Sequence, residues 1–248
     1  MRTEAEEKML KQKIKINSYD VGENGEIKVS ALMKYMQELA VSDIAGTGAT
    51  YEKMRADDMV FVIIRFGINF SQPVRKYDEI EILTVNNRIE GVVFVREYLF
   101  YRGGLPVAEA TTHWVLMSYS RRMPLRPSAL NYPCDPVGMD IKGVELLRRT
   151  DIDTSDPSAA EPYTVRWSAL DENRHLNNTV YARWAADLTG EDYARSHRLR
   201  SLLVEYKKEL PLGAEAELQY TLEADTLYLR GTSEGRDSFL MRCEYDPI

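Results

Sequence analysis

A short polar stretch in the last third of this 248-residue chain gathers the side chains best suited to acid–base chemistry. Asp171, Asn173 and His175 alternate along it, and Asn177 and Asn178 follow directly. In an extended segment, residues two apart point the same way, so we expect the acid, the amide and the imidazole to face one pocket. Such a set can activate water and orient a reacting carbonyl group.

A helix is expected directly after these residues, over 178–188, with Asn177 or Asn178 as its N-cap. It carries its large apolar residues on one side: Val180, Tyr181, Trp184 and Leu188. A helix N-terminus presents unpaired N–H groups and a positive dipole end, which can hold a carbonyl oxygen as it becomes an oxyanion. The alternative is that the polar residues only form a turn and cap the helix.

A further carboxylate, Glu205, stands within the otherwise apolar stretch 202–206. A buried carboxylate must be paired, hydrogen-bonded or shifted in pKa, and such groups cluster at active sites. Alternatively, Glu205 lies on the solvent side and pairs with Lys207, which shares its face of the strand. The pattern leaves both possibilities open.

The other candidates for chemistry carry less weight. His113, opposite in phase to Trp114, is expected to be a strand residue that is either hydrogen-bonded or exposed, and His197 is expected to lie in a basic surface loop. Cys243 is expected to be a small buried residue, and neither it nor Cys134 has a histidine close in sequence. Two cysteines and three histidines argue against a metal site, and no Gly-Xaa-Ser-Xaa-Gly elbow supports a serine hydrolase.

Composition excludes several classes of protein. A hydrophobic fraction of 44% with 29% charged residues is that of a globular chain, and no apolar run approaches the roughly 20 residues that span a membrane. The net charge of −7 disfavours nucleic acid as a partner. The first thirteen residues are charged throughout and include Glu4, Glu6 and Glu7, which argues against a signal or transit peptide, so we expect a cytoplasmic location.

Proline divides the chain. Six of its ten prolines fall between residues 124 and 162, which is typical of a linker rather than a packed element. We therefore expect an N-terminal domain over 1–122, a linker over 123–162 and a C-terminal domain over 163–248.

Both domains show the same order of elements. The first is expected to contain a strand (13–19), a helix (29–44) ended by Gly46 and Gly48, and strands over 59–70, 79–87, 92–101 and 107–119. The second is expected to contain a strand (163–167), the helix 178–188, and strands over 202–208, 215–223, 226–231 and 237–245. A helix followed only by hairpin-connected strands must pack on one face of an antiparallel sheet. The expected fold is α+β, with two tandem hotdog domains, each a sheet wrapped around one long central helix.

At the level of motifs, the chain resembles the acyl-[acyl carrier protein] thioesterases of bacteria and plants. The resemblance covers most of the chain. In the first half it rests on the stretches 19–25, 32–38 and 114–122, and in the second on 170–181, with its Asp-Xaa-Asn-Xaa-His-Xaa-Asn-Asn-Xaa-Xaa-Tyr run, and on 204–209. It implies hydrolysis of acyl-ACP thioesters to free fatty acid and holo-ACP in fatty acid biosynthesis, with no cofactor.

The resemblance also implies roles for particular residues. The implied catalytic network is Asp171, Asn173, His175 and Glu205. Apart from the resemblance, the expected start of the helix places the backbone N–H groups near Asn177 and Asn178 at the oxyanion. The first domain is implied to have lost its catalytic groups and to hold the acyl chain along its helix, at Met33, Met36, Ala40 and Ile44. In one departure, the cysteine that follows the Glu-Tyr strand in the plant enzymes is replaced by Leu210 or a neighbour, which argues against a thiol mechanism.

Several points stay open at this stage. Either Glu205 or Asp171 activates water or attacks directly, with His175 and Asn173 orienting the reactants. The rivals are an acyl-CoA thioesterase, a noncatalytic acyl-thioester-binding hotdog protein and a hotdog dehydratase. An acidic carrier protein would dock on basic residues, for which the candidates are Arg121, Arg122, Arg148, Arg149, the run 195–200, Lys207 and Lys208. A homodimer is left open.

Overall fold

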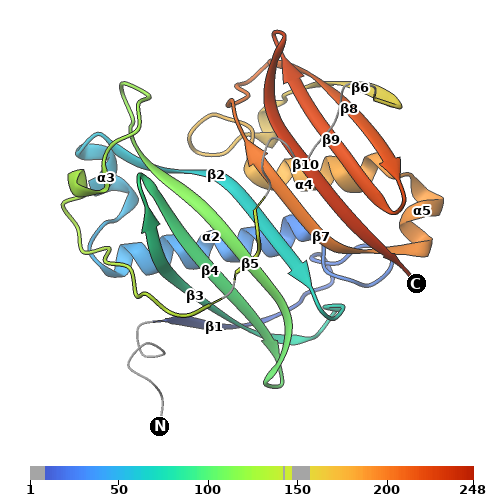
Figure 1. Ribbon diagram of the computed structural model, residues 1–248, viewed down its shortest axis with the longest axis horizontal. Helices are drawn as coiled ribbons and strands as arrows, with labels where there is room; N and C mark the ends of the chain where they lie inside the picture. The colour runs from blue at the N-terminus through green and yellow to red at the C-terminus, as the bar shows by residue number, and fades with distance from the viewer. Residues whose placement is uncertain (1–8, 142, 147–156) are drawn as a thin grey trace.

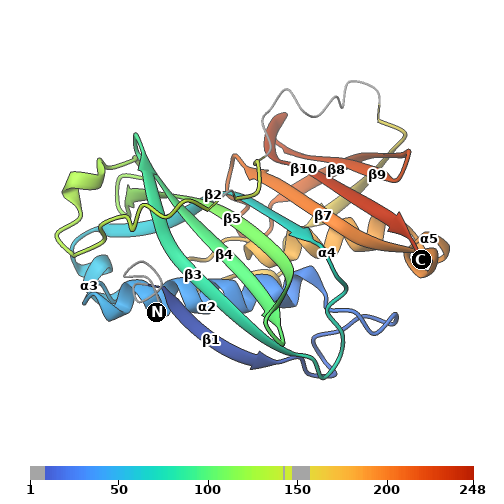
Figure 2. The same ribbon diagram turned by 60° about the horizontal axis from the view of Figure 1, so that its bottom comes forward.

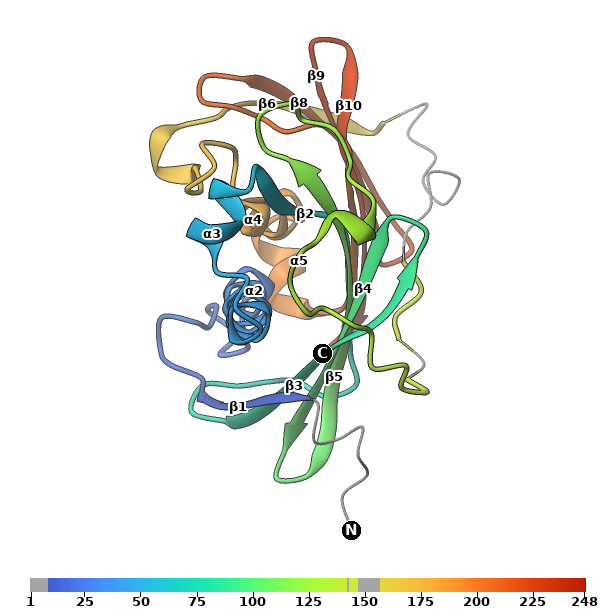
Figure 3. The same cartoon turned by 90° about the vertical axis from the view of Figure 1, so that its left-hand side faces the viewer.

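One antiparallel sheet runs through the whole molecule, and both long helices lie against the same face of it (Figures 1 and 3). The computed structural model describes residues 9–141, 143–146 and 157–248. Within these ranges no helix is long and apolar enough to cross a membrane.

The first segment follows the predicted order closely. Its elements are β1 (Leu10–Lys15), α2 (Val29–Gly46), α3 (Tyr51–Ala56), β2 (Met59–Phe70), β3 (Glu79–Glu90), β4 (Val93–Arg102) and β5 (Leu105–Ser118), with a 3-10 turn at Pro127–Ala129. The strand β1 begins and ends earlier than the predicted 13–19. The short helix α3 was not predicted.

The second segment repeats this order. Its elements are β6 (Ala159–Thr164), a 3-10 turn (Trp167–Ala169), α4 (Asn178–Leu188), α5 (Glu191–Ser196), β7 (His197–Tyr206), β8 (Glu215–Glu223), β9 (Thr226–Ser233) and β10 (Arg236–Pro247). The strand β6 lies earlier than the predicted 163–167, and α5 was not predicted. The basic surface loop expected around His197 is wrong, because His197 begins β7 and its ring stacks on Tyr193 with centroids 3.9 Å apart.

The two segments meet edge to edge. The strand order is β1-β3-β4-β5-β2-β7-β10-β9-β8-β6, so β2 and β7 join the segments at the centre (Figures 1 and 2). Five residue pairs connect these two strands, from Arg65 with Glu205 to Asn69 with Ser201. Backbone hydrogen bonds therefore continue across the junction, and the segments share one sheet.

The helix α2 packs on the sheet through the apolar side that its sequence spacing predicts. Leu32, Met36 and Leu39 are at most 2% exposed, and burial of each such side chain stabilises the fold by about 1.5–3 kcal/mol. The hydroxyl of Tyr98 on β4 donates to the carbonyl of Met36 at 3.2 Å. These contacts fix α2 over the strands of the first segment.

The opposite face of the sheet is covered by the chain that leaves β5 (Figure 3). Val144 and Leu146 pack there on Leu203 of β7 and Leu240 of β10. They cross β2 at Gly67, where a Cβ would lie 2.8 Å from Leu203 and still closer to Leu146. A side chain at this crossing would displace both leucines, so the glycine lets them pack closely on the sheet.

Cys243 is fully buried on β10, in the same core cluster as Phe239 and Met241, which confirms its predicted structural role. His113 lies on β5, as predicted, but the expectation that it is hydrogen-bonded or exposed is wrong: its side chain is partly buried and its Nδ1 has no hydrogen-bond partner among the described residues. Burial and the neighbouring Arg65 lower the pKa of His113 to about 4.

Candidate active site

The polar loop, residues 171–177, forms a tight turn rather than the extended segment that we predicted. The N–H of Asp171 donates to the carbonyl of His175 at 2.8 Å, and Arg174 takes a positive φ of 67°. One carboxylate oxygen of Asp171 accepts the N–H groups of Asn173 and His175 at 2.9 and 3.2 Å. The short aspartate side chain bonds to backbone just after it, which bends the chain. Asp171 thus holds the loop in shape.

Asn177 is the N-cap of α4, the first of the two residues that the sequence offered for this role. Its Oδ1 accepts the N–H of Thr179 at 2.9 Å and the hydroxyl of Thr179 at 2.7 Å. Asn178 begins the helix, and its carbonyl accepts the hydroxyl of Tyr206 at 3.2 Å. The positive end of α4 is thereby fixed beside the polar loop.

The imidazole of His175 faces the carboxylate of Glu209, a residue that sequence reasoning missed. The distance from His175 Nε2 to a Glu209 carboxylate oxygen is 3.1 Å, and the His175 side chain is 17% exposed. A backbone bridge between His175 and Pro211 brings the two segments of chain together. Because Nε2 faces the carboxylate, neutral His175 carries its proton on Nε2 and leaves Nδ1 free as a base. This is the arrangement of a histidine oriented by an acid.

The carboxylate of Glu209 has a second partner from the first segment. Arg122, just after β5, lies 3.2 Å from it. Glu209 itself is 43% exposed, so solvent reaches this group. Arg122 therefore orients Glu209 without enclosing it.

Asn173 is held by α3 of the first segment. The hydroxyl of Tyr51 donates to Asn173 Oδ1 at 2.9 Å, while Arg55 donates to the Tyr51 oxygen at 3.2 Å. Burial, together with the charge of Glu172, raises the pKa of Tyr51. Because Oδ1 is occupied, the amide N–H groups of Asn173 remain available as donors in the site.

The expectation that Glu205 lies within reach of His175 is wrong. Successive residues of a strand point to opposite faces, and Tyr206 points toward α4, so Glu205 points to the other face. There its side chain, 13% exposed, lies 2.8 Å from Arg65 and 2.8 Å from Lys207. Burial alone would raise the pKa of Glu205, but the hydrogen bonds to Lys207 and Arg65 outweigh it and lower that pKa. Glu205 is therefore a structural ion-pair residue. Both alternatives from the sequence hold in part, because its carboxylate is largely buried and also pairs with Lys207.

The four residues predicted to hold an acyl chain line two small cavities along α2. Met33 and Met36 line one of about 20 Å³, which also touches Asn178 at the start of α4. Ala40 and Ile44 line another of about 70 Å³. Trp114 borders both cavities, so it stands between them. Both cavities thus lie along α2, and the smaller one reaches the start of α4.

The basic residues predicted for carrier docking are spread over the surface. Arg122 reaches Glu209, whereas Lys207 pairs with Glu205 and Lys208 with Glu234. Arg148 and Arg149 lie outside the described residues. In the described part of the chain, no three His, Cys, Asp or Glu side chains form a group that could hold a metal ion.

Comparison with known proteins matches the chain to two family models. The model of the acyl-ACP thioesterase N-terminal domain matches residues 7–128, and that of the C-terminal domain matches residues 147–244. The chain is 26% identical over 226 residues to a chloroplastic palmitoyl-acyl carrier protein thioesterase of Cuphea hookeriana, covering 85% of this chain and 54% of that protein. The chain spans about half the length of the curated relatives it matches.

Two solved structures share the fold. An acyl-ACP thioesterase from Bacteroides thetaiotaomicron superposes with a TM-score of 0.84 at 17% identity, covering 98% of this chain and 100% of that one. The 12:0-ACP thioesterase from Umbellularia californica superposes with a TM-score of 0.79 at 20% identity, covering 97% and 98%. The large antiparallel sheet with few helices is therefore a hotdog-like fold.

Proposed function

The chain belongs to the acyl-ACP thioesterase family, and from that premise we propose that it hydrolyses acyl-ACP thioesters to free fatty acid and holo-ACP. The observation that carries the proposal is the His175–Glu209 pair, which lies beside the start of α4 and next to a cavity along α2. A base, a helix N-terminus and an apolar cavity are the three parts that thioester hydrolysis requires.

The proposed chemistry starts with a water molecule held by His175. As the water oxygen attacks the thioester carbon, Nδ1 of His175 takes one proton, and Glu209 stabilises the imidazolium that forms. The carbonyl oxygen becomes an oxyanion at the positive end of α4, near the N–H of Asn178. Collapse of this intermediate breaks the C–S bond, and the departing thiolate takes the proton back from His175.

Asn173 and Asp171 act by position in this scheme. Asp171 holds the polar loop in its turn, and Asn173 presents amide donors because Tyr51 occupies its oxygen. Neither Glu205 nor a cysteine takes part, since Glu205 points to the far face of the sheet. The residue after Glu209 is Leu210, so the site offers no thiol there.

The proposal includes a finer description of the fold. We infer two tandem hotdog units, the first around α2 and the second around α4, joined through β2 and β7. The support is the repeated order of elements and the five residue pairs at the junction. The acyl chain would lie along α2, in the first unit.

A panel of acyl thioesters tests the proposal. One acyl chain is presented on carrier protein and on coenzyme A, and the thiol released is measured with a chromogenic reagent while the free fatty acid is identified by mass spectrometry. We expect faster release from the carrier protein. Equal or faster turnover of the coenzyme A ester would favour an acyl-CoA thioesterase, and binding without any thiol release would leave a noncatalytic protein.

A further inference from the structure

The loop before α2 has the same backbone geometry as the polar loop before α4. The N–H of Gly22 donates to the carbonyl of Glu26 at 2.9 Å, as the N–H of Asp171 donates to the carbonyl of His175 at 2.8 Å. In each case the helix begins three residues after the acceptor. In the first loop, Gly22 and Glu26 therefore occupy the positions that Asp171 and His175 occupy in the polar loop.

The correspondence extends to the chain segment beside each loop. The N–H of Ile27 donates to the carbonyl of Val74 at 2.8 Å, and the N–H of Leu176 donates to that of Leu210 at 2.8 Å. The residue before Leu210 is Glu209, whereas a proline precedes Val74. The first loop thus marks a second site of the same shape that lacks the acid, the imidazole and the glutamate.

This second site opens into a groove of about 750 Å³, far larger than the cavity of about 20 Å³ beside the polar loop. Ala182 and Ala185 stand on α4 at the positions that Met33 and Met36 occupy on α2, counted from the first residue of each helix. Small side chains in place of methionines leave the groove open. Its other apolar lining includes Ile27, Val29, Ala186, Leu199 and Tyr245.

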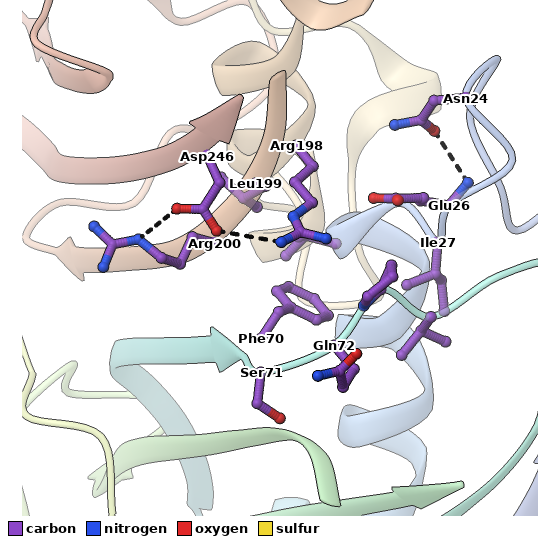
Figure 4. A pocket seen from close by; sticks show the side chains of 13 residues that line it. Asn24, Glu26, Ile27, Phe70, Ser71, Gln72, Arg198, Leu199, Arg200 and Asp246 are labelled. Carbon is purple, nitrogen blue, oxygen red and sulfur yellow. Dashed lines mark hydrogen bonds and ion pairs between the residues drawn. The ribbon is translucent and has the colours of Figure 1, made fainter. Parts of the chain in front are cut away.

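Two cations that line the groove, Lys28 and Arg183, form no ion pair with another described residue. Among the described residues no carboxylate lies within 4.0 Å of Lys28 or Arg183, and Lys28 bonds only to the carbonyl of Tyr19 at 3.3 Å. In the adjoining cavity of about 100 Å³ the cations are paired. Asp246 lies 3.6 Å from Arg198 and 3.3 Å from Arg200 (Figure 4). The groove is also lined by four carboxylates, of which Glu23 and Glu191 pair with Arg195, Glu26 pairs with Arg75, and Asp187 stands one helical turn from Arg183. Lys28 and Arg183 are therefore the cations of the groove that can take up an added anion without breaking an ion pair between described residues.

We propose that this groove binds the anion of a fatty acid and does not hydrolyse thioesters. The alkyl chain packs over Ala182, Ala186 and Leu199, and the carboxylate is neutralised by Lys28 and Arg183. The choice of ligand rests on the proposed function, since the ligand would be the product of the first site. Two fatty-acid sites then occur in one chain, and only the site at the polar loop has the groups for catalysis.

Calorimetric titration of the full chain with sodium dodecanoate, below its micelle concentration, tests the inference by counting the fatty acids bound per chain. We expect two for the wild type. Lys28→Gln combined with Arg183→Gln should weaken one of the two binding events at least tenfold, and Ala186→Trp, at an exposed position of α4, should remove that event by filling the groove. Lys13→Gln, at an exposed lysine on β1 with no ion pair, is the control for loss of charge.

The outcomes separate this inference from the proposed function. Binding of a single fatty acid by a wild type that releases thiol from acyl-ACP would overturn the second site and leave the enzyme intact. Two binding events in a wild type that releases no thiol would refute the proposed function instead. Two unchanged binding events in Ala186→Trp, with an unchanged unfolding temperature, would place the second fatty acid elsewhere and overturn the inference.

Discussion

Replacing one glutamate at a time distinguishes the site seen in the structure from the one that the sequence suggested. Glu209→Gln removes the charge that faces His175, while Glu205→Gln makes the same chemical change four residues earlier on the far face of the sheet. We expect the first variant to lose catalysis with little change in stability. We expect the second to keep catalysis and to lose stability.

The expected loss of stability in each variant follows from how exposed the glutamate side chain is. Glu209 and its partner Arg122 are 43% and 44% exposed, so their ion pair contributes less than about 1 kcal/mol to folding. Loss of an oriented acid–base pair lowers kcat by about 10²- to 10⁴-fold. Glu205 is 13% exposed and holds two cations, so its loss costs about 2 kcal/mol. For a chain of this size that is a fall of about 4–8 °C in Tm.

Both variants are assayed for thiol release at saturating acyl-ACP and for Tm by calorimetry. Because the two changes are chemically identical, each variant serves as the control for the other. A Glu209→Gln protein with wild-type kcat would refute the pairing of His175 with Glu209 as the basis of catalysis. An inactive Glu205→Gln protein with an unchanged Tm would show that the far face of the sheet takes part.

Three further changes test other contacts. Tyr51→Phe removes the bond to Asn173 and should lower kcat about 3- to 10-fold with KM unchanged, whereas Tyr132→Phe, which loses a bond of the same kind to Asp57, should leave both parameters as they are. The low pKa of His113, about 4, means that the folded state favours the neutral ring, so its contribution to stability is complete above pH 6.5 and is lost toward pH 4. Urea unfolding of His113→Gln should show less acid destabilisation, by up to about 2 kcal/mol once solvent screening of the partly buried ring is taken into account. Gly231→Ala places a Cβ into the aromatic ring opposite it on β10, and should lower Tm by several degrees in calorimetry.

Long regular patterns in the sequence predicted the elements that they occupy. The helix α4 and the strands β2 and β8 have the predicted bounds, and α2 differs only at its C-terminal end. The short helices α3 and α5 have six residues each, too few for a helical period to stand out. Thr50 accepts the N–H of Lys53 and caps α3, and a threonine before Tyr51-Glu52 is a start signal that the sequence does contain.

The misplaced glutamate shows where sequence reasoning stops. Alternation along β7 shows that Glu205 and Tyr206 point to opposite faces, but it does not show which face carries α4. That choice depends on β2 and β10, which pair with β7 from other parts of the chain. Glu209 lies beyond the end of β7, where alternation no longer applies, and its place is set by the bridge between His175 and Pro211. Both placements depend on contacts between residues that are far apart in the sequence.

The site is assembled across the junction of the two segments. The second segment supplies the polar loop, while the first supplies Tyr51 against Asn173 and Arg122 against Glu209. The five residue pairs between β2 and β7 fix these contacts, and a register shift of one residue would turn every side chain of one strand to the other face. Gly67 lies at this junction, where Leu146 and Leu203 pack against its Cα because it carries no side chain. Backbone packing at the junction therefore determines the geometry of the reacting groups, even though, among the described residues, no side chain of β2 forms a hydrogen bond or ion pair with the polar loop.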